Sequence, residues 1–167
     1  DGEGKIVILG DRDCSLQRRN QKLVEECPAP HLPDAIRQSM HDKARALAAS
    51  VKYASAGTIE FLYDAESEQY YFLEVNTRLQ VEHGVTELVY GVDIVEWMVQ
   101  LAARSLPDCA SLEAALRPSG AAVQARLYAE DPFENFKPTP GEIDVKFSHR
   151  GRIDSWVGPR SLVSHWF

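Results

Sequence analysis

The chain has 167 residues, of which 44% are hydrophobic and 26% charged, so it can build a small core in one or two domains. Its net charge of −7 argues against nucleic acid or an anionic membrane surface as a partner, because both are negatively charged. The cysteines Cys14, Cys27 and Cys109 are widely spaced, without a CxxC motif or an apolar run that could cross a membrane, a pattern typical of a cytoplasmic protein with reduced thiols.

The first predicted elements are a short strand and a helix. Residues 5–9 follow a glycine turn and are typical of a strand. Because the sequence opens in the middle of this expected hairpin and stops at Phe167 partway through its last expected domain, we expect the chain to be cut at both ends. Residues 33–52 predict a helix, since Pro33 and Asp34 suit its first turn and apolar residues then recur at three- and four-residue steps.

A β-hairpin is predicted next along the chain. Residues 58–63 and 70–75 are rich in β-branched and aromatic residues, and the polar sequence DAESEQ between them is typical of a turn. With the turn centred on Ser67, position 58 pairs with 76, 60 with 74 and 62 with 72. Alternate side chains share a face, which places Thr58, Glu60 and Leu62 beside Asn76, Glu74 and Phe72.

The two opposed glutamates of this hairpin predict a cation site. Like charges placed directly across two strands are destabilising, and burial without a partner adds to the cost. A hard divalent cation removes that penalty, and Mg²⁺ typically takes a couple of carboxylates together with nucleotide phosphates. The alternative is a surface hairpin whose acids are solvated, and a one-residue slip in register would separate Glu60 from Glu74.

The second half of the chain contains one more predicted helix and several strands. Residues 92–103 predict the helix, which begins near Gly91 and Asp93. Proline and glycine mark 106–120 as a linker. Strands are then expected at 122–128, 142–147 and 152–156. The expected domains are therefore 1–105 and 121–167, joined by the linker.

Two long segments resemble a known family. The sequences FLEVNTRLQVEH and RDCSLQRRNQKLVEECPAP are similar to those of biotin carboxylases, within the ATP-grasp superfamily. Members of this family use MgATP to activate bicarbonate as carboxyphosphate and then carboxylate biotin. The resemblance implies an α+β fold class, in which the C-terminal part of an ATP-grasp domain, an antiparallel sheet with helices, is followed by the start of the biotin carboxylase C-terminal domain.

The resemblance also implies roles for individual residues. Three of them match metal ligands for Mg²⁺ or Mn²⁺: Glu60, Glu74 and Asn76. Positions that match the ATP site are Gln17, Asn20, Leu62, Glu60 and Glu74. Positions that match the bicarbonate pocket are Lys22, Arg78, Gln80 and the backbone of Val81. A guanidinium suits this pocket because its planar fork matches a planar oxyanion.

The catalytic residues implied by the resemblance are Glu82, Arg78 and Arg126. Glu82 matches the general base that takes the proton of bicarbonate, although neighbouring cations usually lower the pKa of a carboxylate. Arg126 matches the arginine that stabilises the biotin enolate, an electrostatic role aimed at developing charge. As an alternative, Arg126 is an ordinary salt-bridge partner on a strand.

Several departures from the common pattern resemble the urea carboxylase branch of the family. Asn20 and Gly84 stand where many biotin carboxylases have histidine and proline, which leaves the nucleotide contact of Asn20 open. The segments VDIVEWMVQLAA, FKPTPGEIDVKF and RIDSWV are also similar to this branch. It occurs alone or fused to an allophanate hydrolase as urea amidolyase, so the final acceptor implied is urea.

The partners implied are ATP, bicarbonate, biotin on a separate carrier domain, a carboxyltransferase domain in the same protein and a second copy in a homodimer. Because no glycine-rich phosphate loop precedes Asp1, we expect the isolated fragment to be inactive. The alternatives are the biotin carboxylase of an acetyl-CoA, propionyl-CoA or pyruvate carboxylase, another ATP-grasp ligase, and a non-catalytic structural fragment.

Overall fold

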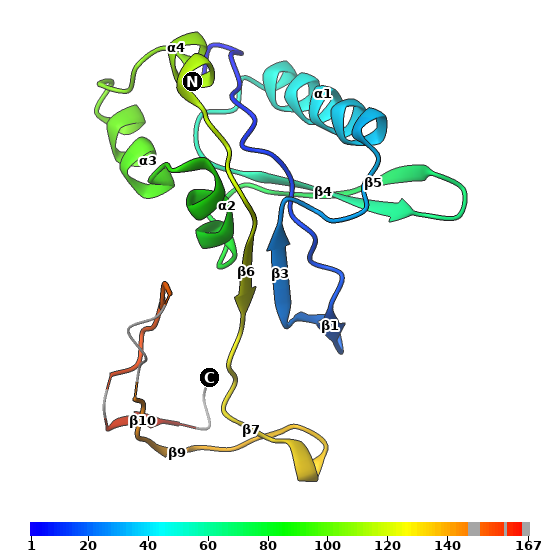
Figure 1. Ribbon diagram of the computed structural model, residues 1–167. Helices are drawn as coiled ribbons and strands as arrows, with labels where there is room; N and C mark the ends of the chain where they lie inside the picture. Colours follow the sequence, from blue (N-terminus) through cyan, green and yellow to red (C-terminus); the bar gives the residue numbers. More distant parts are fainter. Residues whose placement is uncertain (147–150, 159, 165–167) are drawn as a thin grey trace. The chain divides into compact units, whose positions relative to one another are not determined.

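The structure is a computed structural model that describes residues 1–146, 151–158 and 160–164. The backbone forms two compact units, Asp1–Arg126 and Leu127–Phe167 (Figure 1). Helices combine with small sheets whose strand pairs are antiparallel, so the predicted α+β class is confirmed. No helix in the described part of the chain is long and apolar enough to span a membrane.

The elements of the first unit are β1 (Gln17–Arg18), β2 (Gln21–Lys22), β3 (Val24–Cys27), α1 (Asp34–Ser50), β4 (Thr58–Asp64), β5 (Gln69–Asn76), α2 (His83–Tyr90), α3 (Ile94–Ala102), α4 (Cys109–Ala115) and β6 (Ala122–Ala125). Those of the second unit are β7 (Glu130–Asp131), the 3₁₀ helix η1 (Pro132–Glu134), β8 (Lys137–Pro138), β9 (Gly141–Ile143) and β10 (Ser161–Val163).

Both predicted helices are present and slightly shorter than expected. Helix α1 begins directly after Pro33, which has no N–H to donate and suits the entry to a helix. Helix α3 begins after Asp93, whose carboxylate accepts a hydrogen bond from the backbone N–H of Glu96 and so caps the first turn. The local signals at Pro33 and Asp93 therefore located the helix starts to within two residues.

The predicted hairpin is confirmed near the site and shifted near the turn. Thr58 pairs with Asn76 and Glu60 with Glu74, but Phe61 pairs with Phe72, so Leu73 has no partner in the register. This β-bulge turns the remaining side chains of β5 over. Tyr71 rather than Phe72 therefore lies opposite Leu62, and the predicted pairing of 62 with 72 is wrong.

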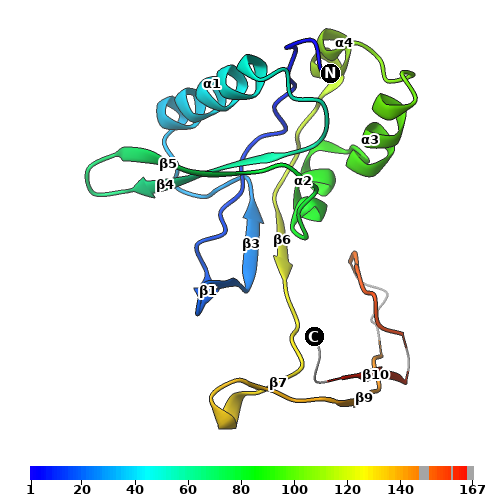
Figure 2. The ribbon, with the colours of Figure 1, turned by 180° about the vertical axis from the view of Figure 1, so that it is seen from behind.

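Helix α1 covers the face of the hairpin that carries the aromatic side chains Phe61, Tyr70 and Phe72 (Figure 2). Phe61 meets Tyr70 and Phe72 in edge-to-face contacts, at centroid distances of 5.6 and 6.5 Å. The Tyr70 hydroxyl lies 2.5 Å from the hydroxyl of Ser39 on α1. The opposite face, with Glu60 and Glu74, is left for the site described below.

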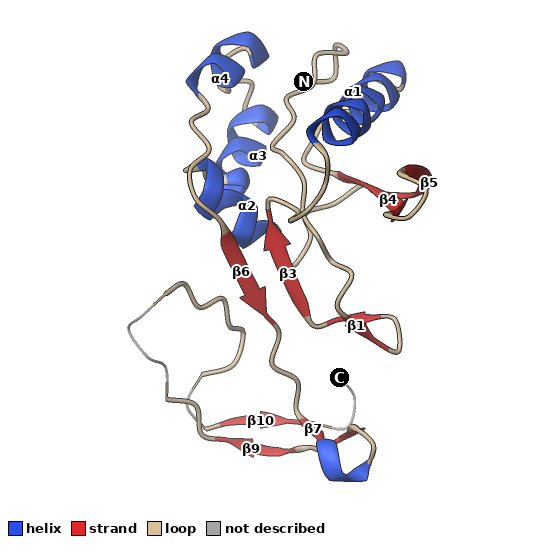
Figure 3. Cartoon of the chain, turned by 45° about the vertical axis from the view of Figure 1, so that its right-hand side comes forward, coloured by secondary structure: helices blue, strands red, loops and turns tan. Residues whose placement is uncertain are grey.

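A second sheet forms between segments far apart in the sequence. Strands β3 and β6 lie side by side and antiparallel, and α2 packs against both (Figure 3). The buried core of this part consists of Cys27, Val85 and Val89, with Tyr90 and Ala122 against them. Helix α2 was not predicted from the sequence. It ends at Gly91, whose φ of 64° is the left-handed conformation that glycine adopts without strain.

Several predicted strands differ from the structure. Residues 5–9 form no strand. At the start of this segment the backbone is bonded by side chains: Asp1 accepts from the N–H of Lys5, and Arg45 donates to the carbonyl of Ile6. Residues 152–156 form no strand either, and there the Ser155 hydroxyl bonds locally to the carbonyl of Val157. The strand expected at 122–128 ends at Ala125.

The remaining differences lie around the expected linker and in the second unit. Segment 106–120 contains α4, which Asp108 caps by accepting from the N–H groups of Ala110 and Ser111. The strand expected at 142–147 is β9, and position 147 lies outside the described residues. Its partner is β10, which was not predicted.

Candidate active site

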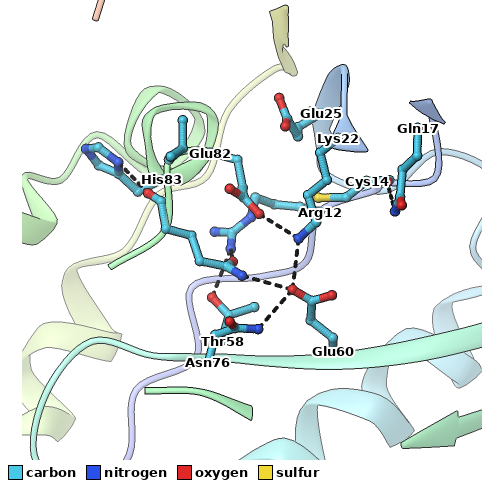
Figure 4. A network of polar contacts seen from close by, with 12 residues as sticks. Arg12, Cys14, Gln17, Lys22, Glu25, Thr58, Glu60, Asn76, Glu82 and His83 are labelled. Atoms are coloured by element: carbon cyan, nitrogen blue, oxygen red, sulfur yellow. Dashed lines mark hydrogen bonds and ion pairs between the residues drawn. The ribbon is translucent and has the colours of Figure 1, made fainter. Parts of the chain in front are cut away.

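Polar side chains from β2, the hairpin, the loop after it and the start of α2 meet in one network (Figure 4). Lys22 joins two carboxylates at its centre. Its Nζ donates to Oε1 of Glu60 and to Oε1 of Glu82, at 2.8 Å in both cases. Burial alone would lower the pKa of Lys22, but the hydrogen bonds to these two carboxylates outweigh it, so the pKa is raised.

Glu60 is the acceptor that ties the hairpin to the following loop. Besides Lys22, its Oε1 accepts from Asn76 Nδ2 at 3.1 Å and from Gln80 Nε2 at 2.9 Å. Asn76 Nδ2 also donates to Oε1 of Glu74 at 2.9 Å. The amide of Asn76 therefore holds together the two carboxylates that the hairpin register places opposite each other.

Glu60, Glu74 and Asn76 carry the kind of oxygen ligands that bind a hard cation. Among the described residues, no group of three or more His, Cys, Asp or Glu side chains is arranged to hold a metal ion. Two carboxylates and an amide oxygen nevertheless suit Mg²⁺, which keeps several waters and takes further ligands from substrate phosphates. The hairpin can thus supply the protein ligands of such a site. One of these ligands, Glu60, also accepts a hydrogen bond from Lys22.

Glu82 is a buried carboxylate held between two cations. It precedes the first turn of α2, is only 2% exposed, and accepts from Lys22 at Oε1 and from Arg126 Nη2 at Oε2, at 2.8 Å each. Burial would raise its pKa, but the hydrogen bond from Lys22 and the charges of Lys22 and Arg12 more than offset this and lower it. Glu82 is therefore ionised near neutral pH.

Arg126 lies just beyond β6 and bridges two acids. Its backbone N–H donates to the carbonyl of Leu23, which continues the β3–β6 pairing by one step. Its Nε donates to Oε1 of Glu25 at 2.6 Å, and its Nη2 donates to Glu82. The predicted catalytic pair Glu82 and Arg126 is thus in direct contact, 44 residues apart in the sequence.

Other predicted residues lie at the border of this network or outside it. Arg78 is exposed and donates weakly to Asn76 Oδ1 at 3.4 Å, so among the described residues Asn76 is what joins it to the network. Gln17 donates to the carbonyl of Cys14 at 2.9 Å. Side chains that are exposed and make no hydrogen bond to the network are Asn20, Leu62 and Val81; the carbonyl of Val81 accepts from Gln124 at 3.5 Å.

Two residues of the network were missed from the sequence. Arg12 donates to Thr58 and Thr86, both at 2.9 Å, and to Oε1 of Gln80 at 2.7 Å. This last bond turns the Gln80 amide so that its Nε2 faces Glu60. Glu25, buried beneath Arg126, is the other. Arg12 lies inside a segment that carried the family resemblance, whereas the two adjacent acids of β3 give no sequence signal that separates the buried Glu25 from Glu26.

Comparison with known proteins identifies the family. Residues 1–107 match the family described as the carbamoyl-phosphate synthase L chain, ATP binding domain. The chain belongs to this family. The match covers the hairpin and the segments that carry Lys22 and Glu82, so the network lies within the ATP-binding domain except for Arg126.

Individual relatives of this ATP-binding domain include a urea amidolyase and a urea carboxylase. The urea amidolyase of Saccharomyces cerevisiae is 52% identical over 165 residues, which are 98% of this chain and 9% of that protein. The crystal structure of Kluyveromyces lactis urea carboxylase matches with a TM-score of 0.94 and 49% identity, over 99% of this chain and 15% of that one. The predicted resemblance to urea carboxylase and urea amidolyase is confirmed, and the chain spans only a small part of these proteins.

A third relative was solved with ligands. The biotin carboxylase domain dimer of Hydrogenobacter thermophilus 2-oxoglutarate carboxylase, in complex with MgADP, ADP and bicarbonate, matches with a TM-score of 0.90 and 37% identity. The match covers 100% of this chain and 37% of that one. The predicted biotin carboxylase resemblance of the ATP-binding domain is therefore also confirmed.

Proposed function

We propose that this chain is part of the biotin carboxylase portion of a urea carboxylase, which carboxylates biotin with ATP and bicarbonate and passes the carboxyl group on to urea, giving allophanate. One observation carries the proposal. A buried carboxylate, Glu82, is held by the cation that contacts the metal-type carboxylate Glu60 and by a second cation, Arg126. A base, an anion-binding ammonium and the protein share of a metal site are thereby linked in one network.

One group of residues is proposed to bind the metal ion and the nucleotide. Glu60, Glu74 and Asn76 would hold Mg²⁺ or Mn²⁺, which when bound neutralises the phosphates of ATP. The side chains proposed to face the nucleotide are Gln17, Asn20 and Leu62, together with Glu60 and Glu74.

Lys22, Arg78 and Gln80, with the backbone of Val81, bind bicarbonate in this proposal. Glu82 accepts the proton of the bicarbonate hydroxyl as a bicarbonate oxygen bonds to the γ-phosphorus and the bond to ADP breaks. Arg126 then stabilises the negative charge that develops on the ureido oxygen of biotin.

The wider context is proposed from the relatives. A carrier domain would present biotin, and a carboxyltransferase domain of the same protein would use it, in the cytoplasm. A homodimer is proposed because the Hydrogenobacter thermophilus domain was solved as a dimer. We also keep the division into domains 1–105 and 121–167 with linker 106–120 as a proposal, and we expect the isolated chain to lack activity.

A second candidate keeps the same half-reaction with another acceptor. It is favoured by the match to a 2-oxoglutarate carboxylase, whose name states a different substrate. An acetyl-CoA, propionyl-CoA or pyruvate carboxylase would belong to the same class. The residues of the network would have the same roles in each of these enzymes, because they act before the acceptor is carboxylated.

The test measures ADP release by the full-length biotinylated protein in the presence of bicarbonate. Urea, acetyl-CoA, propionyl-CoA, pyruvate and 2-oxoglutarate are added separately. We expect stimulation by urea alone. Stimulation by another acceptor would refute the urea assignment, and absence of bicarbonate-dependent ADP release would refute the carboxylase proposal. A Glu74→Gln variant with unchanged Mg²⁺ dependence would instead favour a structural module.

A further inference from the structure

Glu25 is a buried carboxylate for which the proposed mechanism has no role. It lies on β3 and is 0% exposed, although it is a charged residue. Alternation along the strand explains its position, since Glu25 and the equally buried Cys27 point to the side that α2 covers. The intervening Glu26 is partly exposed on the other face. The fold thus places one of two adjacent glutamates inside and leaves the other near solvent.

The partner of Glu25 is the proposed catalytic arginine. Oε1 of Glu25 accepts from Nε of Arg126 at 2.6 Å, while Oε2 has no hydrogen-bond partner among the described residues. Replacing a buried ion pair by apolar residues is often neutral or stabilising, so burial of this acid is a poor device for stability alone. The role of Glu25 is therefore sought in its contact with Arg126.

The two acids bind different nitrogens of the same guanidinium. Glu25 takes the inner Nε, and Glu82 takes Nη2 at 2.8 Å. From Glu25 to Glu60 the charges alternate: carboxylate, Arg126, Glu82, Lys22, carboxylate. Each cation is shared by two acids, so a change at the buried end alters how strongly Arg126 is attracted to Glu82.

We propose that Glu25 is a positioning residue, which anchors the guanidinium of Arg126 through Nε and draws part of its positive charge away from the general base Glu82. This inference rests on the proposed function. It explains how a carboxylate between two cations can still accept a proton, because the second acid partly cancels the field of Arg126. It also fixes the direction in which Arg126 presents its outer nitrogens.

The charged surroundings are consistent with this role. Burial raises the pKa of Glu25, the charge and hydrogen bond of Arg126 oppose that rise, and the negative charge of Glu82 adds to it. The ionisable groups of the described residues that act most strongly on Glu25 or Glu82 include Arg12, Cys14, Lys22 and Arg126, in addition to the two acids themselves. Glu25 and Glu82 thus have pKa values shifted in opposite directions within one cluster.

The test compares Glu25→Gln with Glu26→Gln in the full-length protein. The glutamine at 25 keeps the shape and an acceptor for Nε but removes the charge, and position 26 is the matched control on the same strand. Two quantities are measured: the KM for free biotin, and the pH dependence of kcat/KM for bicarbonate. A folding role alone would lower the amount of active enzyme without moving either quantity.

For Glu25→Gln we expect the KM for biotin to rise about fivefold, because a charge-assisted hydrogen bond becomes a neutral one. The acid limb of the pH profile should move to lower pH, since Glu82 loses a neighbouring negative charge and becomes more acidic. Glu26→Gln should match wild type in both quantities. A Glu25→Asp variant retains the charge but retracts it, so it should raise the KM for biotin with little change in the acid limb.

The outcomes distinguish failure of the proposed function from failure of the role proposed for Glu25. Wild-type protein without biotin- and bicarbonate-dependent turnover refutes the proposed function itself. Active wild type with Glu25→Gln indistinguishable from Glu26→Gln refutes only the role of Glu25, as does a fall in kcat with both quantities unchanged. Where Glu25→Gln does not fold, Glu25→Asp decides, and a normal KM for biotin in that variant overturns the inference.

Discussion

Replacing Lys22 by methionine tests whether the network is held together at its central cation. The change keeps a long apolar side chain and removes two hydrogen bonds of 2.8 Å, one to Glu60 and one to Glu82. The Lys22 side chain is 18% exposed and that of Glu82 only 3%, so screening by solvent is limited. The variant leaves a buried carboxylate with one cation instead of two.

The size of the destabilisation depends on the hydrogen bonds that Glu60 and Glu82 keep in the variant. Hydrogen bonds to charged groups contribute about 1.5–3 kcal/mol each, and removing one partner of a buried pair costs about 3–5 kcal/mol. Glu82 keeps Arg126, and Glu60 keeps Asn76 and Gln80, so the loss is at the lower end. We expect the local free energy of opening to fall by about 2–3 kcal/mol.

Hydrogen exchange of the full-length protein measures this loss at α2 and the hairpin. About 1.4 kcal/mol corresponds to a tenfold change, so exchange should become about 30- to 150-fold faster at neutral pH. The lowered pKa of Glu82 means that its ion pairs stabilise the fold above its unfolded value of 4.5 and are lost as pH falls through the folded value. The difference between the two proteins should therefore shrink in acid. Exchange within twofold of wild type at neutral pH would refute the reasoning, and Lys5→Met, at an exposed position, is the control.

Three further predictions concern the border of the site. Glu74→Gln should raise the Mg²⁺ concentration for half-maximal ADP release by about tenfold, because one of two carboxylate ligands becomes neutral, whereas Glu68→Gln in the exposed hairpin turn should not. Arg78→Ala should raise the KM for bicarbonate by about tenfold or more, and near-normal bicarbonate dependence would contradict its assignment. Burial raises the pKa of Cys14 to about 11, so its alkylation, followed by mass spectrometry, should be slow near neutral pH and accelerate as pH approaches that value. Rapid modification of the partly buried Cys14 near neutral pH would contradict the raised pKa of its thiol.

The opposed glutamates of the hairpin were predictable because their position depends on local signals. A polar turn and period-two alternation fix which residues face each other, and the pair of Glu60 with Glu74 followed directly. The bulge at Leu73 has no such local signal. It brings Phe72 opposite Phe61, which contacts the rings of both Phe72 and Tyr70, and such packing is decided by tertiary contacts.

The buried half of the site depends on contacts that span most of the chain. Arg126 was predicted by resemblance, but its contact with Glu25 bridges 101 residues and arises only when β6 pairs with β3. Strand β3 has the sequence VEEC, whose two adjacent acids conceal the alternation of buried and partly buried positions. The links from Arg12 to Thr58 and Thr86 were hidden for the same reason, since no spacing in the sequence relates them.

The extra residue at Leu73 lets one strand serve two environments. Without it, Tyr70, Phe72, Glu74 and Asn76 would all project from the same side of β5, and aromatic rings would compete with acids for one surface. The extra residue changes which side chains of the strand share a face. The first part of β5 therefore presents aromatic side chains to α1, and its last part presents Glu74 and Asn76 to the site. A single-residue deletion here would thus exchange the two surfaces along half of the strand and separate the chemistry from its scaffold.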